Sequence, residues 1–144
     1  MVDAPTRFVH RLRPRYSEVD MQRVVFYGHW LNFFDDAFNH FLDWLGMPPE
    51  PTFATTFDTM VVKAVVEWVS PARFDDLVEI EVVPVRLGRS SFDVRYEAAV
   101  LGRPACSATI TYVSVVPIAG GPCPIPPDVR GCLVALEPTL GDQG

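Results

Sequence analysis

The hydrophobic pattern of residues 30–45 predicts one long and unusually apolar helix. Apolar side chains recur there every three or four positions, and the polar side chains between them leave only a narrow solvent-facing edge. Gly46 and the prolines at positions 48 and 49 end the pattern, because Gly caps a helix and Pro cannot continue it. We therefore expect the other elements to cover most of this helix. Its apolar positions are Trp30, Leu31, Phe33, Phe34, Ala37, Phe38, Phe41, Leu42, Trp44 and Leu45.

Alternation of apolar and polar residues predicts strands before and after this helix. Residues 7–16 alternate, with Tyr16 on the apolar face, and Pro14 marks an edge or a bulge because Pro cannot donate to a sheet. Residues 50–56 are expected to form a loop. In residues 58–69 the even positions are apolar, which predicts one packed face and one partly wet face. Three tight turns then lead to the remaining predicted strands, at residues 77–87, 91–101 and 105–116.

Together these elements predict an α+β fold in which a long central α-helix is wrapped by a twisted antiparallel β-sheet of about five strands. The sheet face away from the helix still carries Val61, Val65 and Val83. Exposed apolar patches usually mark a partner. We therefore expect a homodimer or homotetramer in which sheet faces or edge strands meet.

The length and composition fit a single globular domain that spans residues 1–144. We place its core at residues 6–116 and a Pro-rich tail at residues 117–144, with a short helix at residues 126–136. A hydrophobic content of 49% with 12% aromatic residues excludes a disordered chain. No apolar run reaches the roughly 18 residues of a membrane span, and the N-terminus lacks the pattern of a signal peptide. We therefore expect a cytoplasmic protein that does not enter a membrane.

The charged and metal-ligating residues exclude two further classes of function. A net charge of −6 argues against a nucleic-acid partner, because neutralising phosphates requires clustered Lys and Arg. The cysteines and histidines lack the spacing of a disulfide framework or a metal site, so we expect reduced thiols and no metal. These residues are Cys106, Cys123, Cys132, His10, His29 and His40.

The start of the long helix is the most promising place for chemistry. Gly28 and His29 lie where unpaired backbone N–H groups and the positive end of the helix dipole favour a developing oxyanion. Asp20 precedes this helix start by a short loop. A carboxylate in that position can act as a base on water or as a nucleophile, and this chemistry requires no cofactor. The alternative for Asp20 alone is a structural role in capping a turn.

The segment YSEVDMQRVVFYGHWLNFFDDA at residues 16–37, together with the order of the predicted elements, resembles the hotdog-fold thioesterases of the 4-hydroxybenzoyl-CoA thioesterase type. These enzymes hydrolyse acyl-CoA thioesters. The resemblance spans roughly residues 8–116, and the segment VVEWVSPARFDDLVEIE at residues 65–81 is similar to the family as well. It implies the hotdog fold and thioester hydrolysis without a separate cofactor, since coenzyme A is part of the substrate.

The resemblance also implies roles for individual residues. Asp20 falls on the catalytic Asp of the family, and Tyr27 with Gly28 falls on the helix start that supplies the oxyanion N–H. The sequence departs from the family at Arg23, where Gly is usual. This Arg places a cation near the expected path of the substrate, so Arg23 is a candidate for substrate binding.

Each of the remaining candidates also has a structural alternative. His29 is a second acid–base candidate or a hydrogen-bonded structural His. Trp30 and Phe34 are candidates for an acyl pocket, and otherwise belong to the core. Because coenzyme A carries phosphates, a donor-rich turn is a candidate contact, and otherwise a solvated hairpin. Its residues are Arg86, Arg89, Ser90 and Ser91.

The sequence therefore predicts an acyl-CoA thioesterase that acts on an acyl-CoA or an acyl-carrier-protein thioester. One alternative is a hydratase or dehydratase of the same fold, in which His29 is the acid–base residue. The other alternative is a non-catalytic module that binds acyl thioesters, which Arg23 in the usual Gly position suggests.

Overall fold

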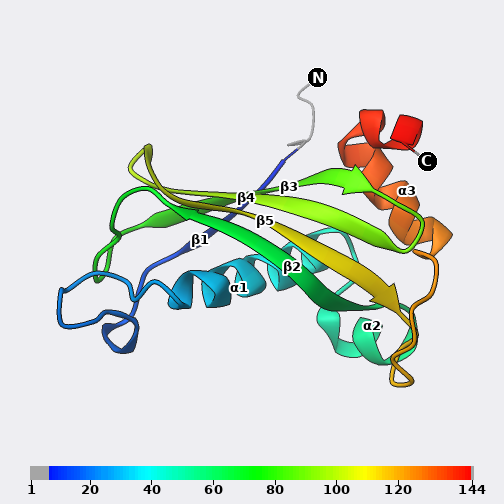
Figure 1. The fold of residues 1–144 in the computed structure, drawn as a ribbon, viewed down its shortest axis with the longest axis horizontal. Helices are drawn as coiled ribbons and strands as arrows, with labels where there is room; N and C mark the ends of the chain where they lie inside the picture. The colour runs from blue at the N-terminus through cyan, green and yellow to red at the C-terminus, as the bar shows by residue number, and fades with distance from the viewer. Residues whose placement is uncertain (1–6, 144) are drawn as a thin grey trace.

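The structure is a computed structural model that describes residues 7–143, and it confirms the predicted α+β fold. A five-stranded sheet has the strand order β1-β3-β4-β5-β2, with every neighbouring pair antiparallel. The long helix α1 lies against one face of this sheet (Figure 1). The elements are β1 Phe8–Leu12, η1 Tyr16–Glu18, α1 His29–Trp44, α2 Pro49–Thr55, β2 Asp58–Trp68, β3 Val78–Leu87, β4 Ser91–Val100, β5 Arg103–Val115, α3 Pro127–Leu136 and η2 Pro138–Gln143.

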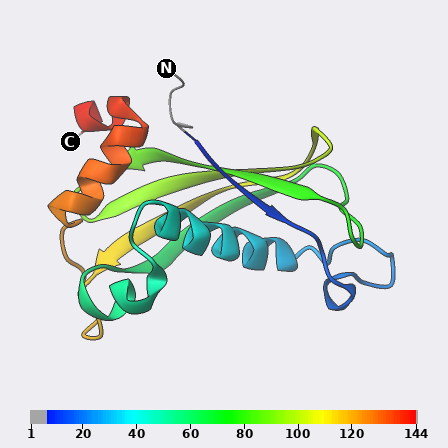
Figure 2. The ribbon, with the colours of Figure 1, turned by 180° about the vertical axis from the view of Figure 1, so that it is seen from behind.

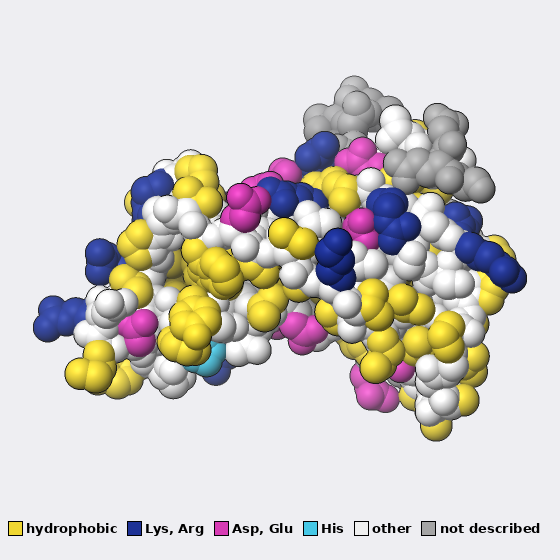
Figure 3. Space-filling view, viewed as in Figure 1, with side chains coloured by type: hydrophobic (Ala, Val, Ile, Leu, Met, Phe, Trp, Pro, Cys, Tyr) yellow, Lys and Arg dark blue, Asp and Glu magenta, His cyan; other side chains and the backbone are white. Residues whose placement is uncertain are grey.

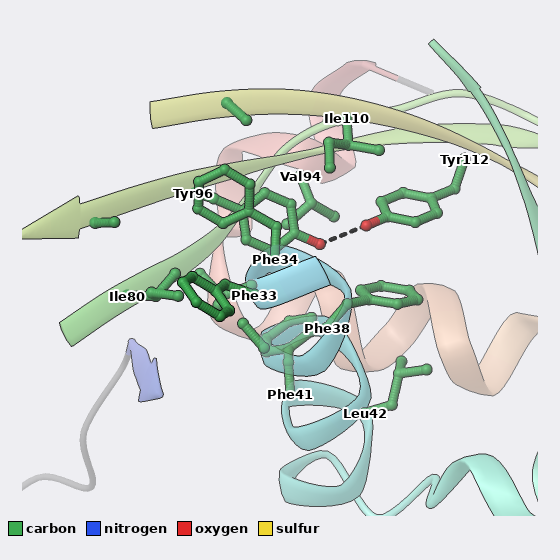
Figure 4. Close-up of a cluster of buried hydrophobic side chains, with 14 of the residues drawn as sticks. Phe33, Phe34, Phe38, Phe41, Leu42, Ile80, Val94, Tyr96, Ile110 and Tyr112 are labelled. Atoms are coloured by element: carbon green, nitrogen blue, oxygen red, sulfur yellow. Dashed lines mark hydrogen bonds between the residues drawn. The ribbon is translucent and has the colours of Figure 1, made fainter. Parts of the chain in front are cut away.

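The predicted long helix is present as α1, and its apolar stripe forms the centre of the core. Phe34 and Phe41 are fully buried, and Phe34 packs on Tyr96 of β4 with ring centroids 5.1 Å apart. Figure 4 shows these α1 side chains meeting the side chains of the sheet, with a hydrogen bond between the hydroxyls of Tyr96 and Tyr112. The stripe is narrower than predicted, since Leu31 and Trp44 are each more than 40% exposed.

Two predicted elements of the first half are wrong in extent or type. The strand predicted at residues 7–16 ends at Leu12, because Pro14 lacks an N–H and the chain turns into η1. Tyr16 is consequently 84% exposed and does not lie on a packed face. The loop expected at residues 50–56 is helix α2, whose prolines occupy the first turn, where a helix tolerates them.

Strand β2 is an edge strand, and it does not have the one packed face that its alternation predicts. The register shifts at Val62, so Val61 pairs with Tyr112 and Val65 with Thr109; the two valines therefore lie on opposite faces and not on one face as expected, and they are 58% and 50% exposed. The reason is its position, because β2 pairs only with β5 while α1 contacts β1 and β3 at the other side of the sheet. Figure 3 shows apolar side chains gathered over this part of the molecule. Val83, which was expected to share this exposed surface, is buried because η2 packs on β3.

The sheet has two ends with different neighbours. We call the end with the loop 15–28 and the β2–β3 loop the loop end, and the end with the 88–90 turn and α3 the turn end (Figures 1 and 2). The ten-residue strand β3 joins them, so about 30 Å separates the two ends. Within residues 7–143, none of the helices has the length and apolar content that a membrane span needs.

Candidate active site at the loop end

Asp20 opens a tight turn in the loop before α1. Its Oδ1 accepts the backbone N–H of Gln22 at 2.8 Å, and its carbonyl accepts the N–H of Arg23 at 2.9 Å. Arg23 closes the turn with a φ of 65°, in the left-handed region that favours Gly. Val19 and Val25 pair across the base of the turn. The turn therefore fixes the Asp20 carboxylate while engaging only one of its two oxygens.

The loop is held in place by the β2–β3 loop. Val24 pairs with Arg73, and the N–H of Val25 donates to the carbonyl of Ala72 at 2.8 Å. Val25 and Ala72 are both buried, so this contact belongs to the core. The predicted catalytic loop is therefore anchored on a rigid part of the fold.

Asp20 lies in an open groove of about 800 Å³ whose walls are mainly apolar. Tyr16 and Phe74 form one wall, with ring centroids 6.3 Å apart, and Met21 is fully exposed. Among residues 7–143, no side chain pairs with the guanidinium of Arg23, which lines the groove, or of Arg73 nearby. The groove thus combines one carboxylate, apolar walls and the guanidinium of Arg23, which is free to meet an anion.

The start of α1 presents an unpaired donor at Gly28 as predicted, but not at His29, whose N–H donates to the carbonyl of Phe26 at 2.9 Å. The carbonyl of Tyr27 accepts the indole N–H of Trp68 at 3.2 Å. In a trans peptide the next N–H, that of Gly28, points the opposite way. Within the described part of the chain, no acceptor binds the N–H of Tyr27 or Gly28. A Cβ at Gly28 would lie 3.2 Å from the ring of Phe26, so the backbone approaches closely here.

Asp20 and the helix start do not share one cavity in the single chain. Tyr27 and Trp30 line a separate hollow of about 310 Å³ with Trp68, and the paired segments around Val19 and Val25 lie between it and the groove. Both hollows are open to solvent at the loop end. The catalytic roles of Asp20, Tyr27 and Gly28 therefore stay predictions.

His29 and Glu18 have structural partners. The amide of Asn32 donates to His29 Nδ1 at 3.0 Å, and no contact joins His29 to Asp20 among the residues described. Glu18 accepts the N–H of Arg15 at 2.7 Å and so caps η1. The structure thus gives Glu18 a capping role and leaves only the Nε2 edge of His29 for chemistry.

The two candidates for the acyl pocket differ. Trp30 is 3% exposed but lines the smaller hollow, whereas Phe34 is fully buried against Tyr96. Phe34 therefore lies in the core and reaches the groove only if the core moves. Cys106 is also buried, and burial together with the charge of Glu97 raises the pKa of its thiol to about 12, so this thiol is no nucleophile.

The predicted phosphate-binding turn lies at the turn end, far from Asp20. Arg86 donates to Asp93 at 2.9 Å and to the hydroxyl of Ser91 at 2.9 Å, so its guanidinium is already engaged. The carbonyls of Arg89 and Ser90 accept the N–H groups of Ile125 and Ser114. Within one chain the structure does not bring these four residues to Asp20. Their contact with substrate stays a prediction, and the Arg86 ion pair argues against it.

Three parts of the candidate site were not predicted from the sequence. Phe74 and Met21 line the groove, and Trp68 positions the Tyr27 carbonyl. The alternation of β2 predicted Trp68 on a packed face. Only its position at the end of β2 suggests that it can reach the Tyr27 carbonyl.

Asp35 on α1 has a raised pKa, first through burial and then through the charge of Asp36.

The fold and the arrangement of the loop define a hotdog-type α+β domain with a carboxylate in the loop that precedes its central helix. Residues 22–106, more than half of the chain, match the Thioesterase superfamily. The chain therefore belongs to the Thioesterase superfamily. The match begins two residues after Asp20, so it does not include this carboxylate.

Similar proteins agree with this family. A protein of Aquifex aeolicus (strain VF5) that is named a candidate esterase is 26% identical over 89 residues, which cover 62% of this chain and 70% of that protein. The structure of a gentisyl-coenzyme A thioesterase is 27% identical, with a TM-score of 0.81 over 88% of this chain and 99% of that one. A thioesterase of Thermus thermophilus, solved with coenzyme A and Zn, is 22% identical, with a TM-score of 0.80 over 92% of this chain and 95% of that one. The family and these names support acyl-thioester hydrolysis.

Proposed function

We propose that this chain is an acyl-CoA thioesterase of the 4-hydroxybenzoyl-CoA thioesterase type. It hydrolyses an acyl-CoA or acyl-carrier-protein thioester to the free acid and the thiol. Two observations at the loop end carry this proposal: the Asp20 carboxylate is held by its turn in an apolar groove, and the N–H groups of Tyr27 and Gly28 are unpaired among the described residues at the neighbouring hollow. A carboxylate and an oxyanion donor are the two groups that acyl transfer to water requires.

The proposed reaction has two routes that differ in the role of Asp20. As a base, Asp20 takes a proton from water while the water oxygen attacks the thioester carbonyl. As a nucleophile, Asp20 itself attacks that carbon, and water then hydrolyses the mixed anhydride. In both routes the N–H of Gly28 stabilises the oxyanion, the C–S bond breaks, and the thiolate leaves and takes up a proton.

Coenzyme A is the favoured thiol carrier in this proposal. One solved structure that shares 27% identity with this chain is a gentisyl-coenzyme A thioesterase. Arg23 in the groove, and Arg73 next to the groove residue Phe74, supply cations for the phosphates of such a substrate, whether these belong to coenzyme A or to a carrier-protein arm. The protein is negatively charged overall, with a net charge of −6, so these local cations matter for anion binding.

We further propose that the working unit is a homodimer joined along β2, or a tetramer built from such dimers. An open edge of 11 residues with apolar side chains on both faces is unstable in isolation and suits pairing with a second copy. Because β2 ends at Trp68, such pairing would also cover the hollows at the loop end. A monomeric mass in light scattering for a fully active enzyme would contradict this assembly.

The experiment that tests the function is thiol release from a panel of short, long and aromatic acyl-CoA thioesters. Asp20→Asn keeps the oxygen that accepts the Gln22 N–H, so it removes the charge and leaves the turn intact. We expect kcat to fall by about 100-fold or more, the scale of a lost general base. Glu18→Gln is the matched control, because Glu18 lies two residues away and caps η1. Its activity should stay within about 2-fold of the unmodified chain.

The panel also separates the other interpretations. Saturable acyl-CoA binding without thiol release identifies a binding module, and equal release by the unmodified chain and Asp20→Asn means that the catalytic carboxylate lies elsewhere. Water addition to an enoyl-CoA that depends on His29 would identify a hydratase. One observation favours the hydratase. The hydrogen bond from Asn32 to His29 Nδ1 leaves His29 Nε2 free to act as an acid or base.

A further inference from the structure

A cluster of two imidazoles and one carboxylate lies between β1 and α1, away from the candidate active site. His10 projects from β1, while Asp36 and His40 stand one turn apart on α1. His10 Nε2 lies 2.8 Å from Asp36 Oδ2, and His40 Nδ1 lies 3.5 Å from Asp36 Oδ1. One ligand atom from each of the three residues can be chosen so that all lie within 4.8 Å of one another.

We propose that His10, Asp36 and His40 form a binding site for a divalent late transition metal, with Zn²⁺ as the representative ion. Two imidazole nitrogens and a carboxylate oxygen match the ligand preference of Zn²⁺, Ni²⁺, Co²⁺ and Cu²⁺, whereas Mg²⁺ and Ca²⁺ prefer oxygen ligands only. Three protein ligands leave coordination positions for water, so the site is open.

The geometry requires only a small adjustment to hold such an ion. Ligand atoms around a tetrahedral Zn²⁺ lie about 3.3 Å apart, given bond lengths of about 2.0–2.1 Å. His40 Nδ1 also lies 2.9 Å from the backbone carbonyl of Asp36, so coordination through Nδ1 requires the ring to leave this contact; the side chains of Asp36 and His40 are 52% and 54% exposed and have room to rotate. His10 is 11% exposed and stacks on His40 with ring centroids 4.4 Å apart, so its ring is already oriented.

The surrounding charge favours a cation. Helix α1 contains Asp35, Asp36 and Asp43 but no Lys or Arg. Arg11, the nearest cation along β1, is engaged by Glu79 at 2.8 Å on the neighbouring strand. A bound ion would link β1 to α1 through its ligands. It would stabilise the folded chain, because the unfolded chain does not hold these three residues together.

This cluster cannot be recognised from the spacing of its residues in the sequence. His10 is separated from Asp36 by 26 positions, so the histidine spacing gave no reason to expect a metal. Only the Asp36/His40 pair has the four-residue spacing of one helix face. The fold supplies the third ligand by placing β1 beside α1.

The test uses the full chain freed of metal with a chelator and titrated with Co²⁺ and Zn²⁺. We expect one ion per chain, visible Co²⁺ ligand-field bands, and a melting temperature that rises with Zn²⁺ or Ni²⁺ but not with Mg²⁺ or Ca²⁺. His40→Ala and Asp36→Asn change exposed side chains and should each weaken Zn²⁺ binding by at least about 10-fold. His10→Ala is avoided as the main test because His10 packs against the helix.

Two controls separate this site from other ligands. His29→Ala removes a histidine outside the cluster, and Cys123→Ser with Cys132→Ser removes the accessible thiols. Both control proteins should bind Zn²⁺ as the unmodified chain does. Binding that survives His40→Ala and Asp36→Asn, disappears with the thiols, or is matched by Mg²⁺ would overturn the proposal, as would no binding at all.

Discussion

The two ends of the sheet show how differently one fold can treat its polar groups. At the turn end, Asp93 accepts hydrogen bonds from Arg86 and from Thr111, which lies 2.7 Å away, and Arg130 donates to the carbonyl of Gly88. At the loop end, Asp20 has one oxygen without a partner among the described residues. Aromatic side chains around it are exposed. Satisfied groups stabilise a fold, whereas groups left open are available to a ligand.

The C-terminal segment explains much of this difference. The N–H of Ile125 donates to the carbonyl of Arg89, and α3 follows directly over the turn end (Figure 2). No described segment of the chain covers the loop end in the same way. Variants at the turn end should therefore lower the stability of the fold. Variants at the loop end should instead lower catalytic activity.

The largest expected effect is the loss of the Gly28 N–H. The φ of Gly28 is −70°, which suits Pro, so Gly28→Pro removes the donor at a compatible position. Removal of one oxyanion donor costs about 100-fold or more in kcat, and we expect that loss in the thioesterase assay.

Gly28→Ala is the control for this change. It adds the same Cβ, which meets the Phe26 ring, but keeps the N–H. We expect a loss of less than about 10-fold, with both variants melting within a few degrees of each other. Equal losses in the two variants would assign the effect to the crowded Cβ and not to the donor.

The second expected effect contrasts one arginine from each end. Arg73→Ala should raise KM for an acyl-CoA by about 3- to 10-fold without changing the unfolding free energy, because its guanidinium has no partner among the described residues. Arg86→Ala should instead cost about 1–2 kcal/mol of stability, since it leaves Asp93 without its charged donor.

An acyl-pantetheine that lacks the nucleotide phosphates identifies the source of the KM change. On this shorter substrate Arg73→Ala should equal the unmodified chain. A rise in KM with Arg86→Ala and none with Arg73→Ala would instead support the phosphate-binding turn predicted from the sequence.

The fold was predictable because its signals are local and strong. The 16-residue helix α1 and the turn-separated strands follow from periodicity alone. The failures have identifiable causes. Helix α2 was hidden by prolines that a first turn tolerates, and β2 alternates like a packed strand although its edge position leaves both faces exposed.

The candidate site was predictable only in part. The loop containing Asp20 and the helix start at Gly28 are close in sequence, so a short motif was enough to find them. Phe74 and Trp68 reach the loop end through contacts distant in sequence, which one sequence does not reveal. Arg86 has the opposite problem, because its residue type suits a phosphate but its ion pair with Asp93 becomes visible only in the folded chain.

The third expected effect is a pair of opposite pH dependences. Burial and the charge of Asp36 raise the pKa of Asp35 in the folded chain. The contribution of Asp35 to the free energy of unfolding is therefore fully present below its unfolded-state pKa. It is lost as the pH rises through the folded-state pKa, because the carboxyl then becomes charged. Asp35→Asn should therefore be more stable than the unmodified chain at neutral pH and lose that advantage in acid.

Asp93 should show the reverse sign. Burial tends to raise the pKa of Asp93, but hydrogen bonds from Arg86 and Thr111 and the charges of Arg86 and Lys63 outweigh it and lower the pKa. Its contribution is present above the unfolded pKa and disappears as the pH falls through the folded value. Denaturant unfolding from neutral pH to about pH 3 should show Asp93→Asn destabilised only at the higher pH. The same sign for both variants would contradict these assignments.

The smallest expected effect concerns Arg23, the departure from the family pattern. With a φ of 65°, Arg23 occupies the conformation that explains why Gly is usual at this position of the turn. Arg23→Gly should exceed Arg23→Ala in stability by about 1 kcal/mol, because both remove the cation but only Gly relieves the backbone. A strained backbone conformation usually persists at a functional site, where the residue has a role that offsets the strain. We therefore expect the guanidinium of Arg23 to bind the substrate. The two variants should therefore share one raised KM for acyl-CoA while differing in denaturation midpoint. An unchanged KM in both would mean that Arg23 is a tolerated strain at the loop end and contributes nothing to binding.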